Sequence, residues 1–377
     1  MSRLADLGAR LQSGETSVDI VGNRRKYFLV SLVLVAISML GLGVRHLDLG
    51  VEFKGGAVFE ARAAAISVSA VRDTMTGAGV TDPKVQKVGS DQVRVETGAL
   101  GQDKEGPIRE ALAKQLGVPT EEVTVQVVGP SWGSDVSSKA SQSLVIFLAL
   151  LAIYLAMVFE WKLAVGALIA LVHDVAITTG IYAIVGFQVS PATVIGLLTI
   201  LGYSLYDTVV VYDKLRENTA NLATSNRYSY SGAANLAINQ TLVRSVNTTL
   251  IALLPVAGLL FVGAGLLGAG TLKDLALVLF VGMAIGAYSS IFIATPLVAV
   301  LKEREPEMQA LAKRVAQRNM ARKAGDPVPA KEGDDQSGVV EQVTRATAAD
   351  SEGPANGGRV QPRRGPLSTR RPGKKGP

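Results

Sequence analysis

Six long apolar runs divide this chain of 377 residues, and polar segments of very different lengths separate them. A run of about twenty mostly apolar residues is long enough to cross a lipid bilayer as a helix. The pattern therefore predicts a polytopic α-helical membrane protein with six transmembrane helices. We expect these helices at residues 27–44, 144–159, 163–185, 192–212, 242–262 and 275–301.

The first apolar run follows Arg24, Arg25 and Lys26, an arrangement that a secretory signal peptide would share. Its length of about eighteen residues, without a small-x-small cleavage motif at its end, favours an uncleaved helix. The expected division of the chain is a segment at 1–26, helix 1 at 27–44, a folded insertion at 45–138, helices 2–6 within 139–301 and a tail at 302–377.

The insertion between the first two apolar runs alternates between strand and helix patterns. Residues 51–63, 84–88, 92–96 and 122–128 alternate apolar and polar positions as strands do, and a Gly-Ser-Asp turn joins the middle two. Residues 67–78 and 103–116 have helical spacing. The order strand–helix–strand–strand–helix–strand is typical of a ferredoxin-like α+β domain.

Composition and charge set the compartment and exclude several classes of site. The sequence is 48% hydrophobic and has no cysteine, which excludes disulfides and thiolate metal sites. Its two histidines lie far apart, so a zinc site is not expected. Lys and Arg are frequent in residues 1–26, at Lys162, in the loop at 213–240 and in the tail, whereas the opposite loops at 186–190 and 263–271 have none. The positive-inside rule then predicts cytoplasmic termini and an extracytoplasmic insertion.

The tail after the last apolar run carries the chain's net charge of +6. Residues 303–324 favour a helix, and the sequence beyond them is rich in Gly, Pro and charged residues, a composition typical of disorder. Its arginines and lysines could touch anionic lipid or ribosomal RNA, or simply remain solvated. The basic character lies in the tail and gives no sign of a groove for sequence-specific nucleic acid.

Asp207 lies deep inside the fourth apolar run, in the stretch GYSLYDTVVVYDKLREN at residues 202–218. A carboxylate inside a membrane helix costs about 2.5–3.5 kcal/mol on insertion scales, so it marks a functional site by default. Helical spacing puts Ser204 and Thr208 on its face, and Asp213 begins the charged end of the helix. The pattern predicts a proton relay at Asp207, and the alternative is a hydrogen bond that only packs helices.

Arg244 begins the fifth apolar run, with Gln240, Thr241, Ser245 and Thr248 at helical spacing around it. We expect this polar face to point inward, so that Arg244 becomes the partner of Asp207 and controls its charge. The alternative is an interfacial arginine whose side chain reaches the lipid headgroups.

Further polar residues lie in the third and sixth apolar runs. Asp174 is a third candidate for the proton relay and His173 a supporting residue, although both could be packing residues with satisfied hydrogen bonds. Adjacent residues point about 100° apart on a helix, so His173 and Asp174 cannot both face one neighbour. In the sixth run, Gly282-x-x-x-Gly286 is a close-packing motif, and we assign Ser289 and Ser290 to the same packing face.

No motif in the chain indicates an enzyme or a bound cofactor. The glycine-rich GLLGAG at residues 265–270 lacks the Lys-Ser/Thr that follows in a phosphate-binding loop, and no hydrolase or metalloprotease signature occurs. An ion gradient is then the expected source of energy, since 100 mV supplies about 2.3 kcal/mol per charge moved.

Several of these segments resemble the SecD/SecF family of protein-export membrane proteins, which are half-unit relatives of the RND transporters. The resemblance covers roughly residues 18–300. It includes the six-helix layout with an outer insertion after helix 1, and it rests on the stretch at 202–218 together with NQTLVRSVNTTL at 239–250, IGAYSSIFIATPL at 285–297, LVHDVAITTGI at 171–181 and GVEFKGGAVFE at 50–60. Tyr206 replaces the Asn that commonly precedes the family's aspartate.

This resemblance implies an accessory subunit of the bacterial Sec preprotein translocase, in the plasma membrane, that uses the proton gradient to promote late-stage export. Asp207 and Arg244 would take part in proton-coupled movement, and SecD would supply another intramembrane carboxylate. The implied partners are SecD, the SecYEG channel, YajC and YidC, the translocating preprotein and membrane lipids. Two alternatives remain open, namely a non-energised scaffold subunit and half of an RND-type small-molecule transporter.

Overall fold

The computed structural model describes residues 17–64, 66–89, 91–222, 227–264 and 270–324. The chain forms two compact units, Met1–Gln317 and Arg318–Pro377, and everything below concerns the first, apart from the last turns of helix α13. The predicted disorder beyond residue 325 lies outside the described residues. Within the described ranges, six helical segments are long and apolar enough to cross a membrane. They are Arg24–Arg45, Ser131–Val158, Trp161–Val185, Pro191–Thr219, Tyr230–Gly263 and Leu272–Glu303.

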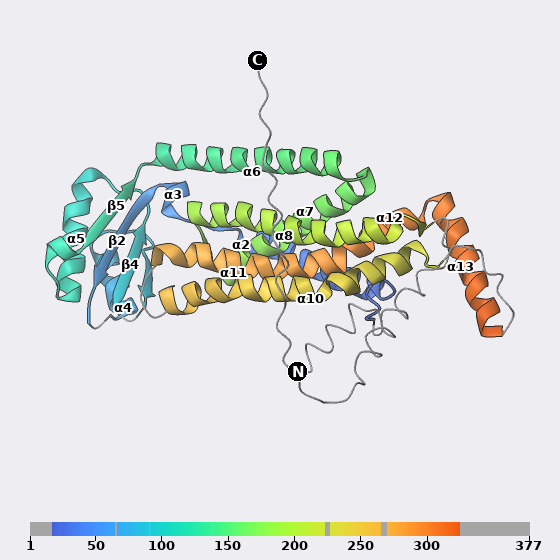
Figure 1. The fold of residues 1–377 in the computed structure, drawn as a ribbon. Helices are drawn as coiled ribbons and strands as arrows, with labels where there is room; N and C mark the ends of the chain where they lie inside the picture. Colours follow the sequence, from blue (N-terminus) through green and yellow to red (C-terminus); the bar gives the residue numbers. More distant parts are fainter. Residues whose placement is uncertain (1–16, 65, 90, 223–226, 265–269, 325–377) are drawn as a thin grey trace, which may run out of the picture. The chain divides into compact units, whose positions relative to one another are not determined.

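The six apolar segments predicted from the sequence are therefore present, and the chain is a multi-pass helical membrane protein (Figure 1). The first four segments are α2 (Arg24–Arg45), α6 (Pro130–Val158), α7 (Trp161–Val185) and α8 (Pro191–Thr219). The fifth consists of α10 (Tyr230–Ala257) and the π-helical η3 (Gly258–Ala264). The sixth consists of α11 (Gly270–Ser289), the π-helical η4 (Ser290–Ala294) and α12 (Thr295–Glu303).

These helices differ in how much of their surface the rest of the chain covers. Half of the most apolar stretch of α7 and of the sixth segment is buried, against 6% for α6 and for the fifth segment. Helices α7, α8 and α11 therefore form the interior of the bundle, and α2 packs along α7. An interior helix offers the positions where a polar side chain avoids lipid.

Local sequence signals explain where the central helices begin and end. The Ser190 hydroxyl accepts a hydrogen bond from the Thr193 backbone N–H, Thr193 in turn accepts from the Ser190 N–H, and Pro191 occupies the first helical position of α8. Helix α7 ends at Gly186, whose φ of 80° is a left-handed conformation that glycine adopts without steric cost.

The insertion folds as a four-stranded antiparallel sheet in the order β3-β4-β2-β5, with two helices between its strands. Helices α4 and α5 cover one face of this sheet, and Figure 1 shows the layer that they form with it. Phe59, Val95, Met75 and Leu112 are buried between the two layers. The elements are β2 (Gly56–Arg62), α4 (Val68–Gly77), β3 (Lys84–Val88), β4 (Gln92–Thr97), α5 (Glu105–Leu116) and β5 (Thr124–Val128).

Two boundaries differ from those predicted. Residues 51–63 were expected to form one strand, but Val51–Lys54 form the short helix α3 and β2 starts only at Gly56. Gly55 and Gly56 have φ angles of 77° and 147°, and a side chain at Gly56 would collide with the backbone carbonyl of Thr97. The glycine pair therefore breaks the strand.

The second difference is that α6 starts at Pro130, inside the segment 45–138 that was assigned to the insertion. Proline is favoured at the first position of a helix, and the polar residues that follow simply continue the same helix. The first turn of α6 packs against α3, where Gly133 lies against the backbone of Phe53.

The sheet domain is also connected to the membrane helices through the α7–α8 loop. The two-residue strands β1 (Asp48–Leu49) and β6 (Gln188–Val189) pair in parallel, and the Gln188 amide donates a hydrogen bond to Glu96 of β4. The chain entering the domain and the loop after α7 are thereby held together.

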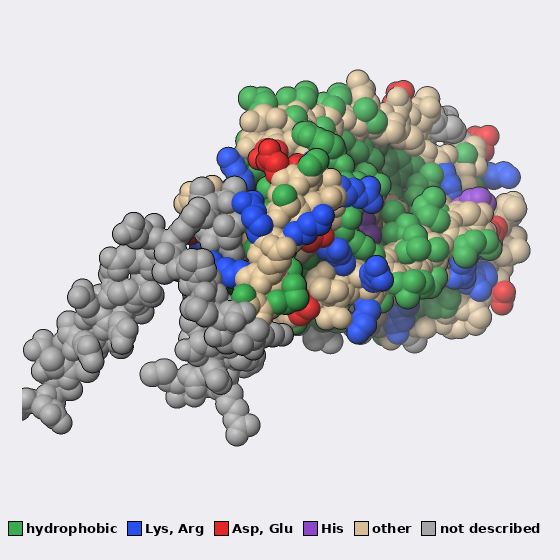
Figure 2. All heavy atoms as spheres, turned by 90° about the vertical axis from the view of Figure 1, so that its right-hand side faces the viewer, with side chains coloured by type: hydrophobic (Ala, Val, Ile, Leu, Met, Phe, Trp, Pro, Cys, Tyr) green, Lys and Arg blue, Asp and Glu red, His purple; other side chains and the backbone are tan. Residues whose placement is uncertain are grey.

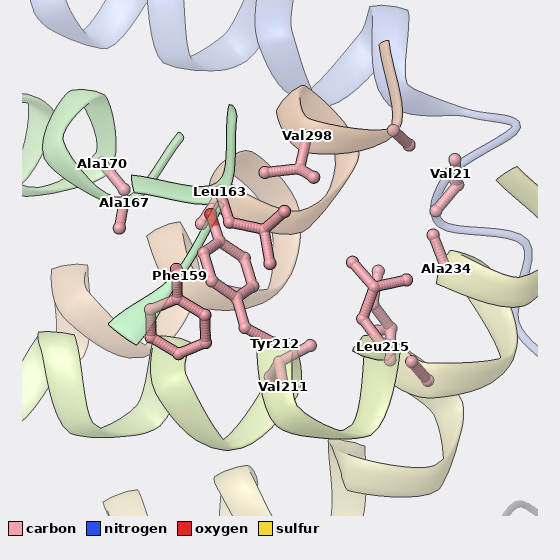
Figure 3. Close-up of a cluster of buried hydrophobic side chains, with 14 of the residues drawn as sticks. Val21, Phe159, Leu163, Ala167, Ala170, Val211, Tyr212, Leu215, Ala234 and Val298 are labelled. Carbon is pink, nitrogen blue, oxygen red and sulfur yellow. The ribbon is translucent and has the colours of Figure 1, made fainter. Parts of the chain in front are cut away.

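The opposite end of the bundle contains its largest apolar cluster and several ion pairs. In Figure 3 the Tyr212 ring lies beside Phe159, Leu163 and Val298, and the rings of Tyr212 and Phe159 are 5.7 Å apart, edge to face. Around this cluster Arg24 pairs with Glu303, Lys162 with Glu305, and Lys302 with Glu160. Figure 2 faces this end and shows Lys and Arg side chains gathered on it.

A last helix, α13 (Pro306–Ala324), follows this end of the bundle. The helix predicted at residues 303–324 is thus present, but a turn before Pro306 separates it from α12. The pKa of Glu305 in that turn is lowered, chiefly because Lys162 donates a hydrogen bond to it, with Lys302 close by.

Candidate functional site

Asp207 of α8 points into the bundle, and its side chain is only 6% exposed. The Ser245 hydroxyl on α10 donates a hydrogen bond of 2.6 Å to its Oδ1. The Ser290 hydroxyl, at the start of η4, donates one of 2.5 Å to its Oδ2. Each carboxylate oxygen thus has one hydroxyl donor from a different helix.

Asp174 of α7 is a second carboxylate and is even more deeply buried, at 1% exposure. Its Oδ2 accepts from the Ser204 hydroxyl of α8 at 2.6 Å and from the Ser289 hydroxyl of α11 at 2.8 Å. Its Oδ1 lies 3.1 Å from Nδ1 of the neighbouring His173. The two acids therefore share one pattern, a buried carboxyl group that accepts hydrogen bonds from two serine hydroxyls.

His173 extends this network to one more helix, α2. Its Nε2 lies 2.7 Å from the Ser31 hydroxyl of α2, and its ring stacks on Tyr288 at a centroid distance of 6.3 Å. As expected from helical spacing, His173 faces α2 while Asp174 faces α8 and α11. Sequence reasoning missed Ser31, although it interrupts an otherwise apolar stretch of the first helix.

The cluster forms two hydrogen-bonded branches, one around each acid, and two consecutive serines of the sixth segment each belong to one branch. One branch runs from Ser31 through His173 to Asp174, and the other runs from Ser245 to Asp207. Ser289 serves the first carboxylate and Ser290 the second. Hydroxyl and imidazole groups both donate and accept hydrogen bonds, so the first branch can pass a proton from Ser31 through His173 to Asp174.

No Lys or Arg of the described residues forms an ion pair with either carboxylate. The oxygens of both carboxyl groups instead accept from neutral serine hydroxyls. Across the described residues, no three His, Asp or Glu side chains gather into a group that could hold a metal ion.

Arg244 is not the partner of Asp207 in this structure, contrary to the expectation from the sequence. Its side chain is exposed at the bundle surface, where Nη2 donates a 3.2 Å hydrogen bond to the Tyr206 hydroxyl. Arg244 and Ser245 point about 100° apart on α10, and Ser245 is the one that faces Asp207. Sequence spacing gave the polar face correctly but assigned the inward position to the wrong neighbour.

The remaining residues predicted around Asp207 are distributed differently. Ser204 is buried but donates to Asp174, and the Thr208 hydroxyl donates to the Ser204 backbone carbonyl at 3.0 Å. Asp213 is exposed near the end of α8, outside the buried cluster. Ser204 thus belongs to the site through the other carboxylate, and Thr208 only supports its helix turn.

The sixth segment contributes more than the packing that was predicted for it. Gly282 and Gly286 lie against α8, and a Cβ at Gly286 would come within 2.9 Å of the Ser204 Cβ. This close approach brings Ser289 and Ser290 within hydrogen-bonding distance of the two acids. Their adjacency inside an apolar helix, one turn after a small-residue motif, was the signal that could have identified them.

Comparisons with known proteins agree with this architecture. A sequence profile described as "Protein export membrane protein SecD/SecF, C-terminal" matches residues 108–304. Protein translocase subunit SecF of Streptomyces coelicolor is 53% identical over 316 residues, covering 84% of this chain and 85% of that protein. Protein translocase subunit SecF of Mycobacterium tuberculosis is 39% identical over 388 residues, covering 97% of this chain and 87% of that protein.

Among solved structures, the crystal structure of SecDF, a translocon-associated membrane protein from Thermus thermophilus, aligns with a TM-score of 0.69 at 31% identity. A second crystal structure, of SecDF in its super-membrane-facing form, aligns with a TM-score of 0.56 at 29% identity. The first alignment covers 77% of this chain and 39% of the SecDF chain, so this chain spans well under half of that protein.

Proposed function

This chain belongs to the SecD/SecF family of protein translocase subunits, and we propose that it acts with SecD to use the proton gradient in a late stage of protein export across the bacterial plasma membrane. Export itself follows from the family, whereas coupling to protons must be argued from the site. The observation that carries it is the pair of buried carboxylates, Asp174 and Asp207, on neighbouring interior helices.

An ionisable group in a membrane helix is expensive and usually marks an ion pathway. Each carboxylate accepts hydrogen bonds from two serine hydroxyls, and neither pairs with a lysine or arginine of the described residues. An ion pair would hold an acid in its charged form, whereas hydroxyl groups let it gain or lose a proton. The site therefore suits reversible protonation.

The partner that completes this site is proposed to be SecD. Arg244 and Tyr206 are exposed on the α8–α10 face at membrane depth, and an arginine there is costly if it meets only lipid. A second membrane subunit that carries a carboxylate would satisfy it. The chain's coverage of less than half of SecDF leaves room for such a second half.

We further propose that the sheet domain is a ferredoxin-like domain on the extracytoplasmic side. Its strand order supports the fold, and the gathering of Lys and Arg at the opposite end of the bundle supports the orientation, with both termini in the cytoplasm. Its connection to the α7–α8 loop through β1 and β6 would let it move with the acid-bearing helices and draw the emerging preprotein outward.

The test is export in membrane vesicles that carry Asp207→Asn, measured with and without a proton gradient. Asparagine keeps the size of the side chain but cannot carry the proton, so we expect the gradient-dependent part of export to vanish while the gradient-independent part stays. Asp135→Asn, the same exchange at an exposed position of α6, is the matched control and should leave export intact. Normal gradient-dependent export by Asp207→Asn would contradict the proposal and favour a scaffold role.

A further inference from the structure

Ser289 and Ser290 sit where α11 passes into the π-helical segment η4, and each hydroxyl has two acceptors within reach. Ser289 Oγ lies 2.8 Å from Asp174 Oδ2 and 3.2 Å from the Gly286 carbonyl. Ser290 Oγ lies 2.5 Å from Asp207 Oδ2 and 3.2 Å from the Ala287 carbonyl. A hydroxyl carries one hydrogen and can donate it to only one of the two acceptors.

We propose that this serine pair is a hydroxyl switch, in which each serine responds to the charge of one carboxyl and the shared helical turn transmits the response to the other. The inference rests on the proposed function, because it assumes that Asp174 and Asp207 gain and lose protons. It assigns Ser289 and Ser290 as positioning residues for that step.

The charge of the acid decides which acceptor the serine chooses. An ionised carboxylate has only acceptor oxygens, so the serine hydrogen points to it. A protonated carboxyl has its own O–H, which donates to the serine oxygen, and the serine hydrogen then turns to the carbonyl of its own helix. Only the proton that enters or leaves the carboxyl changes its covalent partner.

The geometry links the two responses because Ser289 and Ser290 are consecutive residues. Turning either hydroxyl changes the hydrogen bonding of the same turn of backbone, at the start of a π-helical segment. Such segments are loosely wound and occur frequently at functional sites. Close packing of Gly286 on Ser204 brings this turn against α8, which carries Asp207 itself. A change at one acid therefore alters the donor available to the other.

Other titratable and charged groups around the two acids come from four helices. His173 contacts Asp174 directly, whereas Arg244 faces outward and donates to Tyr206. The groups are His173 on α7, Tyr203 and Tyr206 on α8, Arg244 on α10 and Tyr288 on α11. The switch predicts effects that follow the serine substituted, and none of these groups would produce that specificity.

The experiment is infrared titration of the full chain with SecD in lipid vesicles, following the carboxyl C=O bands as the pH changes. Asp174→Asn and Asp207→Asn assign the two bands. We expect Ser290→Ala to move the midpoint of the Asp207 band upward by about one pH unit, since it removes a donor to a charged acceptor, with a smaller shift in the Asp174 band. Ser289→Ala should do the reverse.

Three further variants make the result specific. Ser290→Cys keeps the shape with a weaker donor and should give a smaller shift in the same direction. Ser38→Ala removes a buried serine of α2 that contacts neither acid and should move neither band. Asp207→Asn should shift the Asp174 band in the wild-type background but not in the Ser289→Ala, Ser290→Ala background, because the switch is then absent.

The possible failures are distinguishable. Bands that titrate but ignore both serines, or a coupling that persists unchanged in the double serine variant, would overturn the switch and leave proton use intact. If the wild type shows no titrating carboxyl band that the Asp207→Asn substitution removes, the proposed function itself fails.

Discussion

The sheet domain and the membrane bundle each bury a carboxylate to a similar degree, but the groups that surround the two carboxylates differ. Glu96 in the sheet is 4% exposed and Asp207 in the bundle is 6% exposed. Glu96 lies 3.0 Å from Nε of Arg94, a guanidinium that also pairs with Glu52 and Glu60. Asp207 has serine hydroxyls and no cation.

The difference teaches what each acid is suited to do. Arg94 stays charged at any ordinary pH, and its hydrogen bond to Glu96 makes that carboxylate a fixed part of the domain. Asp207 instead accepts hydrogen bonds from neutral hydroxyl groups. A buried acid with an arginine partner is suited to a structural role, and the hydroxyl donors of Asp207 support the proton transfer that we propose for it.

The largest effect on this comparison should come from removing the arginine that pairs with Glu96 in the sheet domain. Arg94→Met leaves Glu96 buried without its countercharge, and breaking a buried pair in this way costs about 3–5 kcal/mol. We expect the sheet domain to unfold locally far more often, and hydrogen exchange of strands β2 and β4 in the full chain would measure this. Wild-type protection in these strands would mean that Arg94 does not hold the domain together.

A smaller effect is expected from disturbing the packing that brings hydroxyls to the acids. In Gly286→Ala the new Cβ would lie 2.9 Å from the Ser204 Cβ, closer than two non-bonded carbon atoms normally come. Helix α11 must therefore move away from α8. Overpacking of this kind typically costs about 1–3 kcal/mol. We expect lower thermal stability and a lower proton flux together, and Gly258→Ala, where a Cβ meets nothing, is the control. Unchanged flux at reduced stability would separate packing from function.

Ser31→Ala tests the branch that leads through His173. It removes the hydrogen bond from α2 to the imidazole but leaves both carboxylates with their serine donors. We expect the protein to assemble normally and proton flux to fall about tenfold, less than the roughly 10²–10⁴-fold that a proton-transfer group itself contributes, because Ser31 only positions the imidazole. A flux equal to that of wild type would place His173 outside the pathway.

The smallest effect concerns Glu305 at the charged end of the bundle. Because its pKa is lowered in the folded protein, its ion pair with Lys162 contributes stability above the usual pKa of a glutamate, and this contribution disappears as the pH falls through the lowered value. Between neutral pH and about pH 4.5, Glu305→Gln should therefore show a small, constant loss of thermal stability. At lower pH the difference from wild type should shrink.

The sequence predicted the elements that depend on local patterns. The six apolar runs predicted the six membrane helices, and the alternating segments with their turn residues predicted the order of strands and helices along the sheet domain. Asp207 could be recognised because a carboxylate in an apolar run is costly wherever the helix lies.

Features that depend on how helices are rotated against each other were not predictable. Arg244 and Ser245 are neighbours with equal claims from spacing, and only the packed bundle decides which one faces Asp207. Ser289 and Ser290 resemble packing serines until the structure places Asp174 and Asp207 beside them. In the same way, the break at Gly55-Gly56 follows from a close approach to Thr97, a residue distant in sequence.

The most direct test of the account is proton flux through the SecD-containing complex in vesicles, with and without Asp207→Asn. We propose that Asp207 takes up and releases the proton, so we predict a gradient-driven flux in the wild type and none in the variant. A flux of normal size in a correctly assembled Asp207→Asn complex would contradict the claim that this carboxyl carries the proton.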